Sequence, residues 1–128
     1  MKINIETIPH EKQRYPTVGD WWWDNDGTIQ IRVSEMYNEK YEFLVALHEC
    51  VEIMLCKERG ITEEEVSDFD IKFEAEREMK QHSEEDEPGD DPRAPYLSEH
   101  FFATNIERMV ALELDVDWSQ YDSAVVSL

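Results

Sequence analysis

The stretch EFLVALHECVEIMLC, residues 42–56, constrains the fold more than any other part of the sequence. Its apolar residues recur at the spacing of a helix that is buried against other elements. His48, Glu49 and Glu52 nevertheless interrupt its centre. A charge taken out of water without a partner costs on the order of several kcal/mol. The fold must therefore bring compensating groups to these three side chains.

The spacing within this stretch predicts a metal site. In a helix His48 and Glu52, four residues apart, point in the same direction, whereas Glu49 is rotated by about 100°. A histidine and a carboxylate at this spacing can bind one divalent ion, which relieves the desolvation cost of both. Glu49 would then stand beside a metal-bound water as the catalytic general base.

A structural network is the alternative interpretation of the same residues. His48 would be a neutral core histidine, and Glu52 would form a buried ion pair that needs no metal. The partners in such a network would be other polar groups predicted near the core, namely Glu107 or Tyr96 for His48 and Arg108 or Arg93 for Glu52.

Local signals predict strands followed by helices. Alternation in residues 3–8 predicts a half-buried strand, and the turn at Asp26-Gly27 predicts a hairpin within residues 19–34. Helices are predicted from about 39 to 59, 62 to 81 and 96 to 114, with caps at Asn38 and Thr62 and a stop at Gly60. The chain thus reads as one α+β domain, residues 1–128. We expect a small antiparallel sheet, made of the N-terminal strand plus the hairpin, packed against about three helices.

The motif and its surroundings resemble a known family. His48-Glu49-x-x-Glu52 is similar to the H-E-x-x-H signature of zincin metallopeptidases, with glutamate in place of the second histidine. Residues 26–52 also resemble small zincins of phage and bacterial regulatory peptidases, in which a hairpin ends in an edge strand before the active-site helix. The resemblance covers roughly residues 19–114. It implies a zincin-like fold and a metal-dependent peptidase activity.

The resemblance also implies a place for the substrate. In such folds the edge strand pairs with the backbone of a peptide. This would make residues 28–33, with Ile29 and Ile31, the substrate-binding strand.

A later helix supplies the third ligand in the zincin family, and SEHFFATNIER is similar to that segment. On a helical wheel Glu99 falls near the centre of the apolar face of residues 102–110, whereas His100 lies at its edge. We therefore rank Glu99 first and His100 second as the third ligand. Glu107 is predicted to hold His48 in its tautomer.

The glutamate at position 52 departs from the family pattern. A site with two carboxylates carries more negative charge, which weakens the ion as a Lewis acid. Zinc is the metal that the resemblance implies, with iron or manganese as the alternatives.

Charge limits the remaining classes of function. The chain has 31 acidic and 12 basic residues, a net charge of −19, which repels nucleic acid and anionic membranes. The absence of a long apolar run or signal-like start predicts a cytoplasmic protein. The acidic stretch at about 81–95 is predicted to be a solvated loop. The alternative function is a non-enzymatic acidic protein of phage or mobile-element origin that binds a basic protein or mimics DNA.

Overall fold

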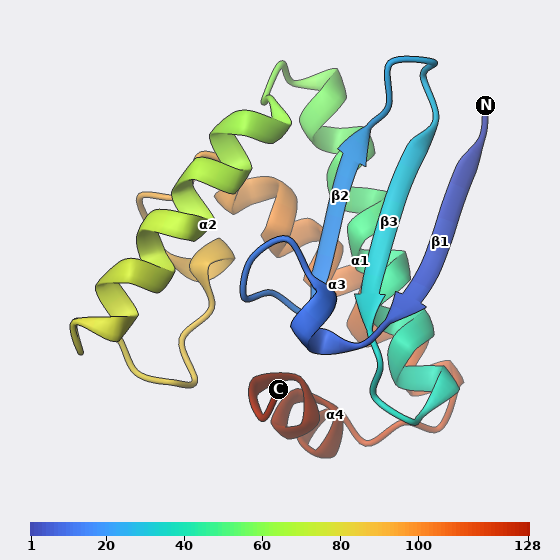
Figure 1. Ribbon diagram of the computed structural model, residues 1–128. Coiled ribbons are helices and arrows are strands. Elements are labelled where there is room, and N and C mark those ends of the chain that lie inside the picture. Colours follow the sequence, from blue (N-terminus) through green and yellow to red (C-terminus); the bar gives the residue numbers. More distant parts are fainter.

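The computed structural model describes residues 1–128 and has an α+β architecture (Figure 1), as the sequence predicts. A fourth helix, absent from the prediction, forms in the C-terminal residues. The elements in chain order are β1 (Ile3–Ile8), the short 3-10 turn η1 (His10–Lys12), β2 (Gly19–Trp23), β3 (Ile29–Ser34), α1 (Glu39–Glu58), α2 (Glu63–Glu78), the 3-10 turn η2 (Pro88–Asp90), α3 (Leu97–Glu113) and α4 (Trp118–Val126).

The sheet is mixed, so the expectation of a wholly antiparallel sheet is wrong. Its strand order is β1-β3-β2, with β3 antiparallel to β2 and parallel to β1. The hairpin turn at Gly27, where φ is 84°, forms as predicted. The chain passes from β1 through residues 9–18 to the far edge before entering β2. The second hairpin strand consequently fills the middle of the sheet.

The predicted helix boundaries follow from local capping. The Asn38 side chain accepts hydrogen bonds from the backbone N–H groups of Lys40 and Tyr41, at 3.1 and 3.3 Å, and so starts α1. Thr62 caps α2 by accepting from the N–H of Glu65 at 3.1 Å. Gly60, with φ of 72°, ends α1 in the left-handed region that glycine adopts freely.

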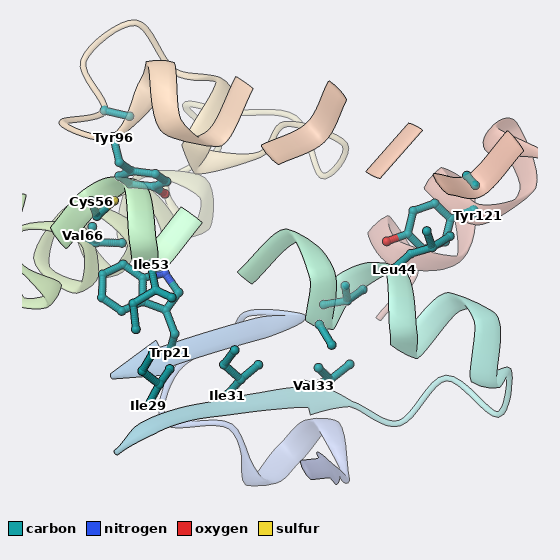
Figure 2. Close-up of a cluster of buried hydrophobic side chains, with 14 residues drawn as sticks. Trp21, Ile29, Ile31, Val33, Leu44, Ile53, Cys56, Val66, Tyr96 and Tyr121 are labelled. Atoms are coloured by element: carbon teal, nitrogen blue, oxygen red, sulfur yellow. The ribbon is translucent and has the colours of Figure 1, made fainter. Parts of the chain in front are cut away.

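The core lies between one face of the sheet and α1. Ile29, Ile31 and Val33 alternate along β3, are at most 1% exposed, and belong to the same cluster as Leu44 and Ile53 of α1 (Figure 2). Burying each such side chain stabilises the fold by roughly 1.5–3 kcal/mol. These contacts fix the rotation of α1 and with it the direction of its polar residues.

The helices do not cover the whole sheet. α1 packs against β2, β3 and α3. β1 lies at the edge of the sheet opposite to β2. Its side chains Ile3 and Ile5 are 38% and 49% exposed, more than the predicted half-buried strand implies. None of the helices has the length and apolar character needed to traverse a lipid bilayer.

Candidate metal centre

Three potential metal ligands from two helices meet inside the molecule. α1 provides His48 and Glu52, and the neighbouring α3 provides His100; all three side chains are buried. His48 Nε2 lies 3.1 Å from Glu52 Oε2 and 3.1 Å from His100 Nδ1. His100 Nδ1 lies 3.2 Å from Glu52 Oε2. The three atoms form a nearly equilateral triangle, and the group could hold a metal ion.

The size of this triangle fits a tetrahedral ion. Bonds of about 2.0–2.2 Å to nitrogen and oxygen place tetrahedral ligand atoms about 3.3–3.6 Å apart, slightly farther than the 3.1–3.2 Å found here. Two imidazoles and one carboxylate also match the donor types that zinc, iron and manganese accept. The residues present therefore fit a divalent ion with three protein ligands.

Further contacts orient two of these ligands. Glu107 Oε1 lies 2.8 Å from His48 Nδ1, as predicted, so that His48 Nε2 faces Glu52 and His100. The Trp21 indole N–H donates to Glu52 Oε1 at 3.0 Å and leaves Oε2 for the group. Such outer contacts are typical of metal ligands.

The partners that the structural alternative names are found only for His48, whose contact with Glu107 belongs to that network as well as to a metal site. Glu52 has other partners, namely Trp21 and the two imidazoles. It pairs with neither predicted arginine. Arg93 binds Glu76 and Asp91 instead, whereas Arg108 lies over the ring of Trp118.

The electrostatics of the group favour a positive charge between the three atoms. Burial alone would lower the pKa of His48, but hydrogen bonds to Glu107 and Glu52 raise it to about 10. Burial also opposes the charged form of His100, whose pKa is raised to about 12 mainly by carboxylates including Asp90 and Glu52. Burial opposes ionisation of Glu52 too, yet hydrogen bonds from the two imidazoles lower its pKa. A divalent ion can supply this charge in place of the protons.

Glu49 lies next to the three ligands without joining them. Gly19 at the start of β2 makes room for it, because a Cβ at position 19 would overlap the Glu49 carboxylate. Burial raises the pKa of Glu49 well above its usual range, and the neighbouring Glu52 raises it further. The hydrogen bonds of the group run among His48, Glu52, His100 and Glu107 and do not include the Glu49 carboxylate.

The predicted first choice of third ligand, Glu99, does not lie in the group. Glu99 is buried, but its carboxylate binds Arg59 at 2.6 Å and lies outside the group. The helical wheel assumed that Phe102 and Met109 face the core, whereas they are 50% and 66% exposed. The buried face of α3 is instead formed by Glu99, His100, Ala103, Glu107 and Ala111.

The expected substrate strand, residues 28–33, is not an edge strand. β3 is paired on both sides, and Ile29 and Ile31 are completely buried, so neither is available to a peptide. β2 is the edge strand nearest the candidate centre. Because Val18 and Asp24 make inward hydrogen bonds to the β3 side, the backbone groups of Gly19, Trp21 and Trp23 point outward.

A cleft of about 820 Å³ reaches the candidate centre. Its walls include residues 19–21 of β2, part of α2, the acidic segment 84–90 and the C-terminal residues 125–128. His48, Glu49, Glu52 and His100 all line it. The three ligands and Glu49 therefore border one common cleft.

Comparisons with known proteins add no relative: neither family models, nor curated protein sequences, nor solved structures gave a match to this chain. The site therefore has to be interpreted from its own geometry. Sequence reasoning missed Trp21, Gly19 and the turn η2, which contact the site only through long-range packing. No local sequence pattern around these residues predicts that they contact the candidate metal site.

Proposed function

We propose that this protein binds a divalent metal ion, zinc first among the candidates, and acts as a metal-dependent hydrolase on peptides or proteins. The ligands are His48, Glu52 and His100. The observation that carries the proposal is the triangle of their three atoms, 3.1–3.2 Å on each side. The outer contacts that orient His48 and Glu52 support it further.

The residues around the proposed ion would have different roles in hydrolysis. A divalent ion held by His48, Glu52 and His100 would polarise a carbonyl and lower the pKa of a bound water. Glu49 is the general base, because its carboxylate adjoins the ligands and lines the same cleft. Glu107 and Trp21 keep His48 and Glu52 in the orientation that binding requires.

The substrate backbone is proposed to lie along β2. This strand borders the cleft at residues 19–21, where the outward N–H groups of Gly19 and Trp21 can pair with an extended chain. The outward carbonyls of these two residues already accept hydrogen bonds from Thr17 and Arg14, and the Trp23 N–H donates to Glu63. Gly19, which adjoins Glu49, would place the scissile bond near the candidate centre. The proposal keeps the edge-strand principle of the zincin resemblance and moves it from β3 to β2.

The decisive experiment is metal analysis of untagged protein. Wild-type protein, His48→Ala and the control His82→Ala are loaded with Zn²⁺, dialysed and measured by elemental analysis. His82 also pairs with a carboxylate, at 2.7 Å from Glu76, but lies outside the ligand triangle. We expect one ion per chain in wild type and His82→Ala and a loss in His48→Ala. Equal, negligible metal in all three proteins would remove the proposal.

A second candidate function is binding of a basic protein or peptide without catalysis. Thirteen carboxylates but only two arginines line the cleft, so its field attracts cations of any kind. This function predicts salt-sensitive binding of a lysine-rich peptide that His48→Ala retains. Hydrolysis that requires both metal and Glu49 would favour the metal-dependent hydrolase over non-catalytic binding.

A further inference from the structure

The acidic segment between α2 and α3 is an ordered wall of the cleft beside His100. Within it the turn η2 packs against both α2 and α3, and Gly89 at its centre is buried. A Cβ at Gly89 would overlap the imidazole of His100. The backbone of the turn therefore lies directly on the ring, at a distance that only glycine permits.

The second nitrogen of His100 faces the two carboxylates that flank this glycine. His100 Nε2 is buried and makes no hydrogen bond. It lies 3.4 Å from Glu87 Oε2 and 3.5 Å from Asp90 Oδ1, within ion-pair range of both. Ionised carboxylates only accept hydrogen bonds, so the nitrogen that faces them is the one that carries a hydrogen. The lone pair then belongs to Nδ1, the atom in the ligand triangle.

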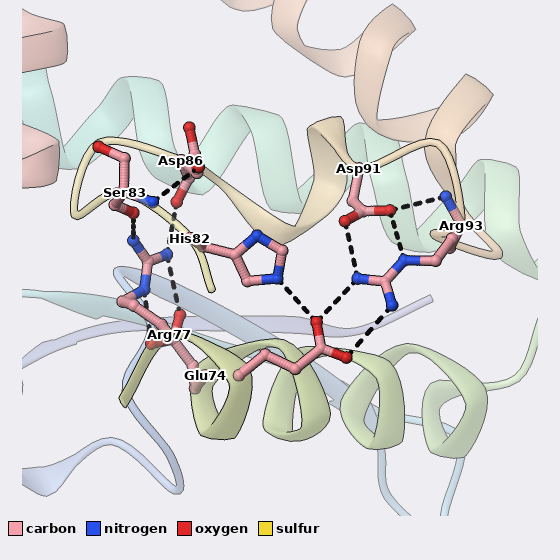
Figure 3. A network of polar contacts seen from close by, with 8 residues as sticks. Glu74, Arg77, His82, Ser83, Asp86, Asp91 and Arg93 are labelled. Carbon is pink, nitrogen blue, oxygen red and sulfur yellow. Dashed lines mark hydrogen bonds and ion pairs between the residues drawn. The ribbon is translucent and has the colours of Figure 1, made fainter. Parts of the chain in front are cut away.

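A network anchored on α2 holds this turn in place (Figure 3). Arg93 binds Glu76 at 2.8 Å and Asp91 at 3.0 Å, so that one side chain joins α2 to the residues just after η2. Arg77 binds Glu74 and donates to the carbonyls of Ser83 and Asp86 just before it. Both ends of the turn are therefore tied to the same helix.

We propose that the turn η2 is a positioning element for His100. Glu87 and Asp90 select the tautomer with its lone pair on Nδ1, and Gly89 sets the angle of the ring. The inference rests on the proposed metal site. It gives a role in that site to the acidic segment, which is predicted from its charge to be a solvated loop. Glu87, Gly89 and Asp90 act through His100 and need no contact with the ion.

The test compares two double variants of equal charge. Glu87→Gln/Asp90→Asn removes the carboxylates that face His100. Glu84→Gln/Glu85→Gln removes the same charge from the same segment, at exposed residues without a contact to His100. Zn²⁺ affinity is measured by chelator competition, and the visible spectrum of bound Co²⁺ reports the ligand geometry. Melting of the metal-free proteins controls for a general loss of structure.

We expect Glu87→Gln/Asp90→Asn to bind Zn²⁺ about 10- to 100-fold more weakly and to change the Co²⁺ spectrum. The Glu84→Gln/Glu85→Gln control should differ little from wild type in both. Gly89→Ala should weaken binding in the same way with both carboxylates retained.

Two results would overturn the positioning role while leaving the metal site intact. The first is wild-type affinity and an unchanged spectrum in Glu87→Gln/Asp90→Asn. The second is two ions per wild-type chain with one lost in that variant, which would make Glu87, Asp90 and His100 ligands of a second cation. Absence of metal from wild type would instead defeat the proposed function itself.

Discussion

At the scale of single residues, Glu49 separates a metal-binding protein from a hydrolase. It lines the cleft beside His48 and Glu52, yet it is not one of the converging ligands. Glu49→Gln should therefore keep one zinc per chain and lose at least about 100-fold in turnover, because the amide cannot accept a proton. Cleavage of a peptide library followed by mass spectrometry measures this.

The matched control for Glu49→Gln is Glu58→Gln at the exposed end of the same helix, which should behave as wild type. Full cleavage activity in Glu49→Gln would assign the proton transfer to another group. Loss of the metal in Glu49→Gln would make this carboxylate a ligand.

A second residue-scale prediction concerns Asp70, buried on α2. Burial raises its pKa to about 7 from the usual 3.8 of an aspartate, although hydrogen bonds from Tyr96 and Tyr15 favour the ionised form. Between about pH 4 and pH 7 the folded state holds this proton while the unfolded state releases it. The free energy of unfolding should accordingly fall as pH rises through that window, by at most about 4 kcal/mol.

Asp70→Asn isolates the contribution of this carboxyl, because asparagine does not titrate. Urea unfolding at intervals from pH 4.5 to 7.5 should show a weaker loss of stability with rising pH in Asp70→Asn than in wild type. Asp68→Asn, an exposed change on the same helix, should keep the wild-type slope. An identical slope in all three proteins would contradict the raised pKa.

At the scale of elements, the rotation of α1 explains why its polar residues meet α3. Leu44 is completely buried against the sheet, whereas its neighbour Phe43 is 53% exposed. Leu44→Ala should reduce the free energy of unfolding by about 2–5 kcal/mol through lost burial and a residual cavity. Phe43→Ala should cost less than about 1 kcal/mol. Urea unfolding of both variants measures the difference, and equal losses would place α1 in another rotation.

How far the sequence predicts these elements depends on the range of the interactions. The start of α1 at Asn38 and of α2 at Thr62 depends on bonds within four residues, so local patterns predict both. The position of β3 in the middle of the sheet depends on pairing with β1, far away in the sequence. No pattern within residues 28–34 distinguishes a central strand from an edge strand.

The third ligand shows the same limit on α3. Its apolar residues suggest one buried face, but Phe102 and Met109 are exposed while Glu99, His100 and Glu107 point inward. The buried face is set by the groups that α1 presents, because His48 and Arg59 provide partners for these polar side chains. A helical wheel contains no information on the partner helix.

At the scale of the whole molecule, the candidate site joins α1 to α3 and should couple metal binding to stability. Unfolding separates His48 and Glu52 from His100, so an ion bound by all three stabilises only the folded state. At a free Zn²⁺ concentration of 100 times Kd this amounts to about 2.7 kcal/mol, or roughly 10 °C in Tm for a chain of this size. Scanning calorimetry of chelator-treated protein, with and without Zn²⁺, checks the shift.

The net charge of −19 supplies a competing explanation for any such shift, since every divalent cation screens repulsion between carboxylates. Mg²⁺ at the same concentration measures that general effect, because it prefers six oxygen ligands and should not occupy a site with two imidazoles. The Zn²⁺ shift should exceed the Mg²⁺ shift in wild type and in His82→Ala, and the excess should vanish in His48→Ala. Equal shifts with both ions would attribute the stabilisation to the acidic surface, because only a specific site distinguishes the two cations by their ligands.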